Sequence, residues 1–246
     1  ASLAPSEMCI RDSVQLLPNA SIQTSETGMR HRTAERVARQ TGYPVISVSQ
    51  SMRIISLYVD GKRHVLEPSE SILASANQAL SALERYKARL DQTSAGLDSL
   101  EIEDLVTVRD VTSVLQLMEM VRRISADIDS YVLELGTDGR LLALQVEELT
   151  RGLLAEHGFL LEDYLPEGLD TTTVDARLKW VGSPALLDLA MVARSMGLGG
   201  IDGQDLDAQV SPRGLRILSK IPRLPVVTAR AVVEQWGSLP VSYTHL

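Results

Sequence analysis

The chain has 246 residues, 44% of them hydrophobic and 23% charged, with a net charge of −8, which is typical of a globular protein with one large core or two to three small ones. No apolar run reaches the roughly 20 residues that a membrane-spanning helix needs, and no basic segment followed by an apolar stretch opens the chain. We therefore expect a cytoplasmic protein without a membrane partner, and the single cysteine, Cys9, excludes an internal disulfide.

The two ends of the chain differ in character from the rest. Residues 6–13, SEMCIRDS, and residues 241–246, VSYTHL, resemble translated sequencing adapters. We therefore expect residues 1–13 and 241–246 to be non-native and without function. On this interpretation the natural protein extends in both directions.

Residues 27–42, TGMRHRTAERVARQTG, predict a helix that begins after the turn at Gly28 and ends at the next glycine. The first amides of a helix lack intrahelical partners and favour anions. Arg30, His31 and Arg32 would add charge-assisted donors around that end, because successive residues lie about 100° apart. The pattern predicts a polyphosphate site. The alternative is a solvated, arginine-rich helix face.

Residues 43–66 predict two or three strands. YPVISVS is an apolar run rich in β-branched residues, and MRIISLYV and RHVLE flank the Asp60-Gly61 pair, which favours a two-residue hairpin turn. Together with the preceding helix, these strands are typical of the second half of an α/β domain.

From Pro68 onward the apolar spacing is helical, and the stripes indicate packing between helices rather than a ligand site. A further helical pair is predicted at about 174–197, and the glycine-rich residues 196–203 predict a flexible joint. Three stripes are expected to form the core: Leu73, Ala76, Leu80, Leu83 and Leu90; Val111, Val114, Leu115, Met118 and Val121; and, in a third helix after Gly139, Leu142, Val146, Leu149 and Leu153.

Residues 211–236 carry a local charge of +4, so the other 220 residues carry −12. Two short helices, at about 212–220 and 226–236, are predicted on either side of the turn IPRLP. They resemble a helix-hairpin-helix unit, which grips DNA phosphates without reading bases. The prolines of the turn supply no N–H donor, which leaves a simple capping pair as the alternative. The candidate DNA-binding residues are Arg213, Arg216, Lys220, Arg223 and Arg230.

No spacing of histidines and cysteines predicts a zinc site, and no G-x-S-x-G elbow predicts a serine hydrolase. Glu101, Glu103 and Asp104 are better explained as a solvated helix start than as a metal cluster. We therefore assign no metal ligand within this chain.

Five segments together resemble the DisA family of bacterial diadenylate cyclases, and they occur in the order expected for that family. The likeness covers roughly residues 14–240. The segments are NASIQTSETGMRHRTAERVARQTGYPVISVSQS, ILASANQALSALERYKARLDQ, EIEDLVTVRDV, YVLELGTDGR and SPRGLRILSKIPRLP.

The resemblance implies an α/β partial diadenylate cyclase domain followed by an all-α helical linker domain and a partial helix-hairpin-helix domain. It places these at residues 14–90, 91–205 and 206–240. It also implies a homo-octamer whose cyclase domains face one another and whose activity falls on branched DNA. Two other hypotheses stay open, a non-enzymatic helix-hairpin-helix DNA-binding protein and a helical protein-binding scaffold.

The resemblance also implies the chemistry, in which two ATP molecules are condensed into cyclic di-AMP with Mg²⁺ or Mn²⁺. Arg30, His31 and Arg32 would be catalytic and hold the ATP phosphates, with Thr33 and Ser49 as further donors. Two features depart from the family. Methionine stands at position 29, where the family usually has threonine, and the Asp-Gly-Ala motif expected upstream is absent. We therefore expect this chain by itself to be inactive.

Overall fold

The computed structural model describes residues 14–49, 54–200 and 203–237. The segments 1–13 and 241–246, predicted to be non-native, lie outside the described residues. Contacts divide the chain into two compact units, Ala1–Ser71 and Ile72–Leu246.

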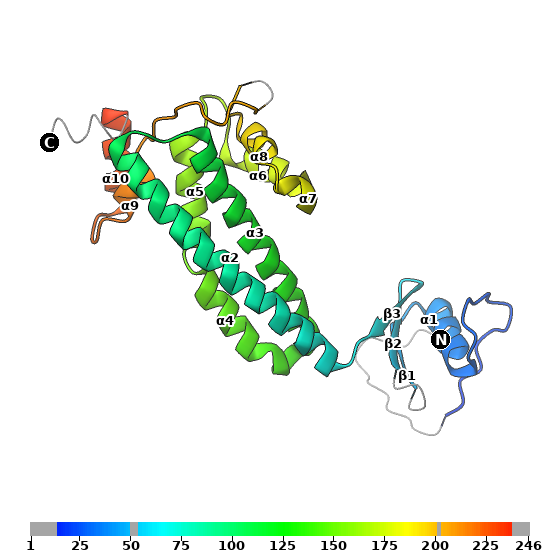
Figure 1. Ribbon diagram of the computed structural model, residues 1–246. Coiled ribbons are helices and arrows are strands. Elements are labelled where there is room, and N and C mark those ends of the chain that lie inside the picture. The colour runs from blue at the N-terminus through cyan, green and yellow to red at the C-terminus, as the bar shows by residue number, and fades with distance from the viewer. Residues whose placement is uncertain (1–13, 50–53, 201–202, 238–246) are drawn as a thin grey trace. The chain divides into compact units, whose positions relative to one another are not determined.

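The first unit is a helix packed on a three-stranded antiparallel sheet of order β1-β2-β3 (Figure 1). The helix is α1 (Met29–Thr41), and the strands are β1 (Val45–Ser49), β2 (Ile54–Val59) and β3 (Lys62–Leu66). Asp60 and Gly61 have φ angles of 51° and 71°, as a tight hairpin turn between β2 and β3 requires. The predicted helix, strands and hairpin are confirmed.

The two faces of this sheet differ in polarity. Burial alternates along β1 and β2, so one face packs against α1 while the other is open. The buried face is small and polar, formed by Ser47, Ser49, Ser56 and Tyr58. The open face is apolar, with Ile46, Val48, Ile55 and Leu66 exposed. The unit therefore has little apolar core of its own, limited to Ala34, Ala38 and Tyr58 with Val45 packed against them.

The regular secondary structure described for the second unit is helical, apart from an isolated β-bridge between Thr107 and Gln209. Its helices are α2 (Ser69–Glu103), α3 (Val108–Leu135), η1 (Gly136–Gly139), α4 (Arg140–Thr150), α5 (Leu153–Tyr164), α6 (Thr171–Trp180), α7 (Ser183–Leu186), α8 (Leu189–Met196), α9 (Leu215–Ser219) and α10 (Val226–Trp236). Its longest helix, α2, has 35 residues and so spans about 52 Å. None of the helices in the described ranges is long and apolar enough to cross a bilayer.

Among the described residues of this unit, one apolar core cluster runs through α2, α3, α4, α5, α6 and α8. All the predicted stripe residues are buried in it or packed against it, so the stripes are confirmed as core. The third predicted helix, however, is two helices. Gly152 adopts a φ of 79°, which ends the helical run after α4 and lets α5 begin at Leu153. The pair predicted at about 174–197 is likewise three short helices, α6 to α8.

The division into compact units falls at neither of the two predicted domain boundaries. The boundary at residue 90 lies inside the continuous helix α2, whereas the compact units divide between Ser71 and Ile72. The boundary at residue 205 is not a division between units, because residues 206–210 pair with the chain that leads into α3. Backbone hydrogen bonds join Val108 N to Ala208 O at 3.0 Å and Val210 N to Val106 O at 2.9 Å.

The predicted C-terminal helices are present as α9 and α10, but they are part of the helical unit. Helix α9 packs on α5 and on α10. A separate helix-hairpin-helix domain is not shown, since the described residues end at 237 and this pair packs on its neighbours.

Candidate functional site

The predicted phosphate-binding turn lies at the N-terminus of α1. Gly28 caps the helix without a side-chain hydrogen bond, and the first turn contains no acidic residue. Arg30 and Arg32 are exposed there, and Met29 is 84% exposed. The first-turn amides and two guanidinium groups therefore share one solvent-facing end of the helix, an arrangement that favours a multiply charged anion.

Three arginines of α1 hold the chain that leads into the helix. The Nε atoms of Arg32 and Arg36 donate to the carbonyls of Glu26 at 2.8 Å and Ile22 at 2.9 Å, and Arg39 Nη1 donates to a third carbonyl, that of Gln23, at 2.8 Å. Arg32 thus has a structural role through Nε in addition to its exposed position at the turn.

His31 is the buried member of the triplet and is only 4% exposed. Its Nδ1 lies 3.1 Å from the Tyr58 hydroxyl, and the Glu26 carboxylate is close enough to influence the pKa of that tyrosine. Burial, followed by the nearby Glu26, raises the pKa of Tyr58 to about 12, so this hydroxyl stays protonated. This protonated hydroxyl can donate to His31 Nδ1 or accept from it, depending on which ring nitrogen carries the proton.

The other ring nitrogen of His31, Nε2, is buried without a hydrogen-bond partner among the described residues. Leaving a buried polar atom unpaired costs about 1 to 3 kcal/mol. With the proton on Nδ1, Nε2 accepts a hydrogen bond from a ligand hydroxyl, and with the proton on Nε2 it donates to a phosphate oxygen. An orphaned nitrogen flanked by two exposed arginines is the strongest ligand-binding feature of the first unit.

The two hydroxyl residues predicted at this site lie in the same unit. Thr33 is half-buried on α1, and Ser49 is buried at the end of β1, in register with Ile54. Because α1 packs on β1, the structure brings both into the helix-sheet layer.

The described carboxylates near this turn do not fit a divalent cation. Glu26 pairs with Arg63 at 3.1 Å, and the buried Glu35 pairs with Arg39 at 2.6 Å and accepts from Thr24. No group of three or more potential metal ligands occurs within the described ranges.

The C-terminal basic residues do not form the open patch that their sequence suggested. Arg216 is 0% exposed and lies between α2 and α5. Its guanidinium donates to Glu101 from Nε at 3.1 Å and from Nη2 at 2.7 Å, and to Ser94 Oγ at 3.1 Å. It also pairs with Asp98 at 2.6 Å. Arg216 cannot contact DNA from this position, and we remove it from the DNA-binding set.

Three of the other candidates are also engaged. Arg213 donates to the carbonyls of Glu162 and Leu165 at 3.2 and 3.1 Å. Lys220 pairs with Asp98 at 2.6 Å, and Arg230 pairs with the Glu162 carboxylate. Arg223 is exposed in the turn before α10, with a φ of 68°, and no partner is described for it.

The acids of α2 and α5 account for this difference from the sequence prediction. Asp98, Glu101 and Glu162 are three carboxylates paired with the C-terminal cations, so the local balance of +4 falls to +1. Acids from distant parts of the chain neutralise the basic segment.

Sequence reasoning missed the buried polar network around Arg216. The Tyr164 hydroxyl donates to Glu101 at 2.6 Å, and the Asp163 carboxylate accepts from the amides of Leu215 and Arg216 at 2.7 and 2.8 Å. Burial raises the pKa of Asp163 to about 6, although the two amides lower it. Burial and the adjacent Glu101 carboxylate raise the pKa of Tyr164 far above its usual range. The partners are separated by up to 122 residues, so no local spacing could have indicated them.

Comparison with known protein families gives two matches. Residues 3–63 match the model described as DisA bacterial checkpoint controller nucleotide-binding, and residues 66–204 match the model described as DisA bacterial checkpoint controller linker region. The junction between the matches lies close to the division between the two compact units. The first match also includes most of the segment 1–13 that we had interpreted as non-native.

Several curated proteins are similar along nearly the whole chain, and all are DNA integrity scanning proteins DisA. The protein from Streptomyces coelicolor is 55% identical, covering 94% of this chain and 63% of its own length. That from Acidothermus cellulolyticus is 56% identical with the same coverage. That from Kineococcus radiotolerans is 52% identical, covering 94% of this chain and 65% of its own length. The chain thus spans somewhat less than two thirds of the relatives that it matches.

Proposed function

Because this chain belongs to the DisA bacterial checkpoint controller family, we propose that it forms part of a diadenylate cyclase, a nucleotidyltransferase that also scans DNA for branched or damaged structures. In the proposed reaction the 3′-hydroxyl of each ATP attacks the α-phosphorus of the other. Two P–O bonds form, two pyrophosphates leave, two protons are released and cyclic di-AMP results. Membership of this family does not favour a non-enzymatic DNA-binding protein or a scaffold.

One observation carries the proposal, the unpartnered Nε2 of His31 between the exposed Arg30 and Arg32 at an uncapped helix start. Nucleotidyl transfer depends chiefly on positioning and on stabilising phosphate charge. The two guanidinium groups and the α1 amides would hold the phosphates, and His31 would contact the nucleotide from the buried side. Thr33 and Ser49 are proposed as additional donors.

The reaction requires two nucleotide sites that face each other, so we also propose self-association, as a homo-octamer in the full-length protein.

The family resemblance implies Mg²⁺ or Mn²⁺ as the cofactor, which would neutralise phosphate charge. The described residues do not fit such an ion, because Glu26 and Glu35 are already paired with arginines. Accordingly, no step of the proposed chemistry passes through a metal held by these side chains.

The test is a chimera in which residues 14–237 of this chain replace the matching segment of the Streptomyces coelicolor relative. We expect the chimera to convert ATP to cyclic di-AMP with Mn²⁺, measured by chromatography of the products. The unaltered 246-residue chain should give none, because the Asp-Gly-Ala motif that the family resemblance implies is not in its sequence. A folded chimera that binds no ATP would contradict the assignment of the nucleotide site.

DNA binding is the second part of the proposal, and the structure limits what this chain can contribute to it. A net local charge of +1 and one exposed, unpaired arginine, Arg223, leave about one or two phosphate contacts. We expect weak binding without sequence preference.

Salt titration measures the number of these contacts. At about −0.9 per phosphate contact, the slope of log affinity against log salt should lie between about −1 and −2. Arg223→Glu should flatten it for every DNA sequence tried. The matched control is Arg89→Glu, at an exposed arginine of α2, which should leave the slope unchanged. A slope steeper than about −3, or sequence-selective binding, would contradict this limit.

A further inference from the structure

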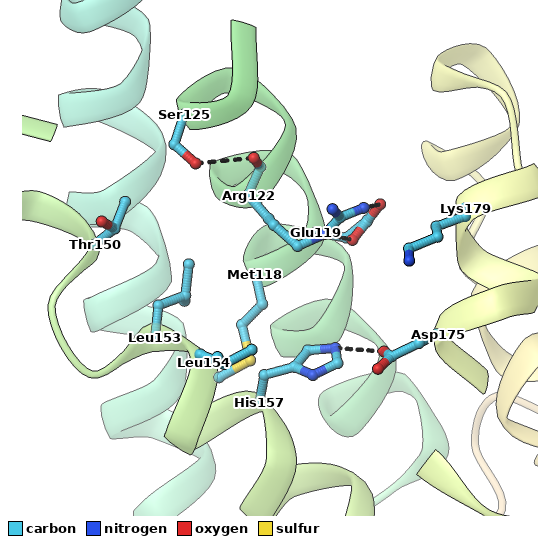
Figure 2. Close-up of a pocket in the computed structure, with 10 residues that line it drawn as sticks. All are labelled: Met118, Glu119, Arg122, Ser125, Thr150, Leu153, Leu154, His157, Asp175 and Lys179. Atoms are coloured by element: carbon cyan, nitrogen blue, oxygen red, sulfur yellow. Dashed lines mark hydrogen bonds and ion pairs between the residues drawn. The ribbon is translucent and has the colours of Figure 1, made fainter. Parts of the chain in front are cut away.

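A cavity of about 370 Å³ lies inside the helical unit, between α3, α5 and α6 and beside the end of α4. Figure 2 shows Met118, Glu119 and Arg122 from α3, His157 from α5, and Asp175 and Lys179 from α6 around it. Met118, Leu153 and Leu154 supply apolar surface. A volume of this size is in the range of small-molecule sites, which combine apolar walls with a few polar groups.

On the α3 side of the cavity, the buried Glu119 carboxylate pairs with Arg122, which lines the cavity, and with Arg123, which does not. Arg122 donates to Glu119 from Nε and Nη2, both at 2.7 Å, and Arg123 Nε donates to the same carboxylate at 2.7 Å. Burial raises the pKa of Glu119, but the hydrogen bonds from both arginines outweigh this and lower it. The carboxylate is therefore ionised and accepts three hydrogen bonds from the two arginines, and the three groups together retain one positive charge.

Arg122 still has donor capacity facing the cavity. Its Nη1 has no hydrogen bond in the described part of the chain, whereas Arg123 turns its Nη2 away to the carbonyls of Leu178 and Val181. The side chain of Arg122 is also partly exposed, so a ligand can reach it.

The α6 wall adds a cation that has no carboxylate partner among the described residues. Lys179 is exposed and lines the cavity, and no carboxylate lies within ion-pair distance of it among the described residues. Asp175 lies 3.7 Å from His157 Nε2, and burial lowers the pKa of His157, which keeps this ring mostly neutral. Among the charged residues that line the cavity, Arg122 and Lys179 balance Glu119 and Asp175, and Arg123, which pairs with Glu119 from outside the lining, adds one positive charge nearby.

The break between α4 and α5 borders the cavity. Helix α5 begins at Leu153, which lines the cavity, and its cap, Gly152, has no side chain for the first-turn amides. The positive end of that helix dipole therefore lies beside the cavity, where Glu156 in the same first turn offsets part of it.

We propose that this cavity binds a small amphipathic anion, an aromatic or branched aliphatic body that carries one carboxylate, sulfonate or phosphate. Arg122 and Lys179 hold the anionic group, and Met118, Leu153 and Leu154 contact the apolar body. The site lies wholly in the helical unit and is independent of the proposed cyclase chemistry.

The experiment titrates the full 246-residue chain with 1-anilinonaphthalene-8-sulfonate, a fluorescent anion of this class. We expect one saturable site. Lys179→Gln should weaken binding by about tenfold, since it removes a charge-assisted contact. Lys62→Gln, at an exposed lysine of β3, is the matched control and should leave the affinity unchanged.

A second pair of variants tests the location. Leu154 is 83% exposed on the rim of the cavity, and Leu133 is 85% exposed on α3 but does not line it. Leu154→Glu should weaken binding by at least about tenfold through charge repulsion, and Leu133→Glu should not. Absence of saturable binding, equal affinity of Lys179→Gln and Leu154→Glu with the parent chain, or equal affinity for the uncharged N-phenyl-1-naphthylamine would each overturn the proposal.

Discussion

Replacing Arg216 with methionine should lower the free energy of unfolding of the helical unit by about 3 to 5 kcal/mol. Arg216 is fully buried and supplies the donors that compensate the buried Glu101 carboxylate. Methionine fills similar volume but leaves that charge without its partner. The loss is measured by chemical denaturation followed by circular dichroism.

Two controls separate the buried charge from the loss of an ion pair as such. Arg109→Met breaks an exposed pair with Asp207, 3.0 Å long, and should cost less than about 1 kcal/mol. The triple variant Glu101→Met, Tyr164→Phe, Arg216→Met removes the charge together with the hydroxyl that depends on it. It should recover most of the stability, because apolar replacement of a whole buried pair is often neutral or stabilising. A loss in Arg216→Met no greater than that in Arg109→Met would show that the network is not stabilising.

The Arg216→Met variant should also show which helices the buried network stabilises. Asp163 holds the first amides of α9, and Arg216 fixes α9 against α2. Loss of the guanidinium should therefore increase hydrogen exchange in α9 and α10 before it does so in the core of α3.

In the chimera, replacing both Arg30 and Arg32 with alanine should lower turnover or ATP affinity by more than about a hundredfold. Each hydrogen bond to a charged group contributes about 1.5 to 3 kcal/mol, and both guanidinium groups lie at the proposed phosphate site. The measurement is the rate of cyclic di-AMP formation, with ATP affinity taken from equilibrium binding. Met29→Thr, which introduces a hydroxyl beside the phosphates, should raise activity or leave it unchanged.

The single variants should differ in kind. Arg30 has no described partner, so Arg30→Ala should lower turnover or ATP affinity without lowering the free energy of unfolding. Arg32→Ala also removes the bond to the Glu26 carbonyl and should loosen the chain before α1. The matched control is Arg39→Ala, which removes contacts to Gln23 and Glu35 and should affect stability more than turnover. Wild-type activity in the double variant would show that the site is assigned to the wrong residues.

The secondary structure followed from local sequence to a large extent. The Asp60-Gly61 pair determines a tight turn because both positions require positive φ, and the stripes on α2 and α3 follow from a period of 3.6 residues. The predicted third helix was wrong in one respect, since apolar spacing continued through Gly152 while the backbone did not. The spacing of apolar residues indicates which side of a helix is apolar, but it does not indicate whether the helix continues.

The charges of the C-terminal segment could not be interpreted from sequence alone. Arg216 and Lys220 look like a basic patch because their partners, Asp98 and Glu101, lie more than a hundred residues earlier. Whether a cation is free depends on which carboxylates the fold brings to it, and that is a property of the packing.

The sequence by itself determined the location of the nucleotide-binding candidate and its chemical character, because Arg30, His31 and Arg32 are adjacent at a glycine-preceded helix start. Only the tertiary structure decided how the three divide their roles. Packing of α1 on β2 buries His31 against Tyr58 and leaves Nε2 unpartnered, while Arg30 and Arg32 stay in solvent. Adjacent side chains point in different directions on a helix, and which of them becomes buried depends on where the sheet packs.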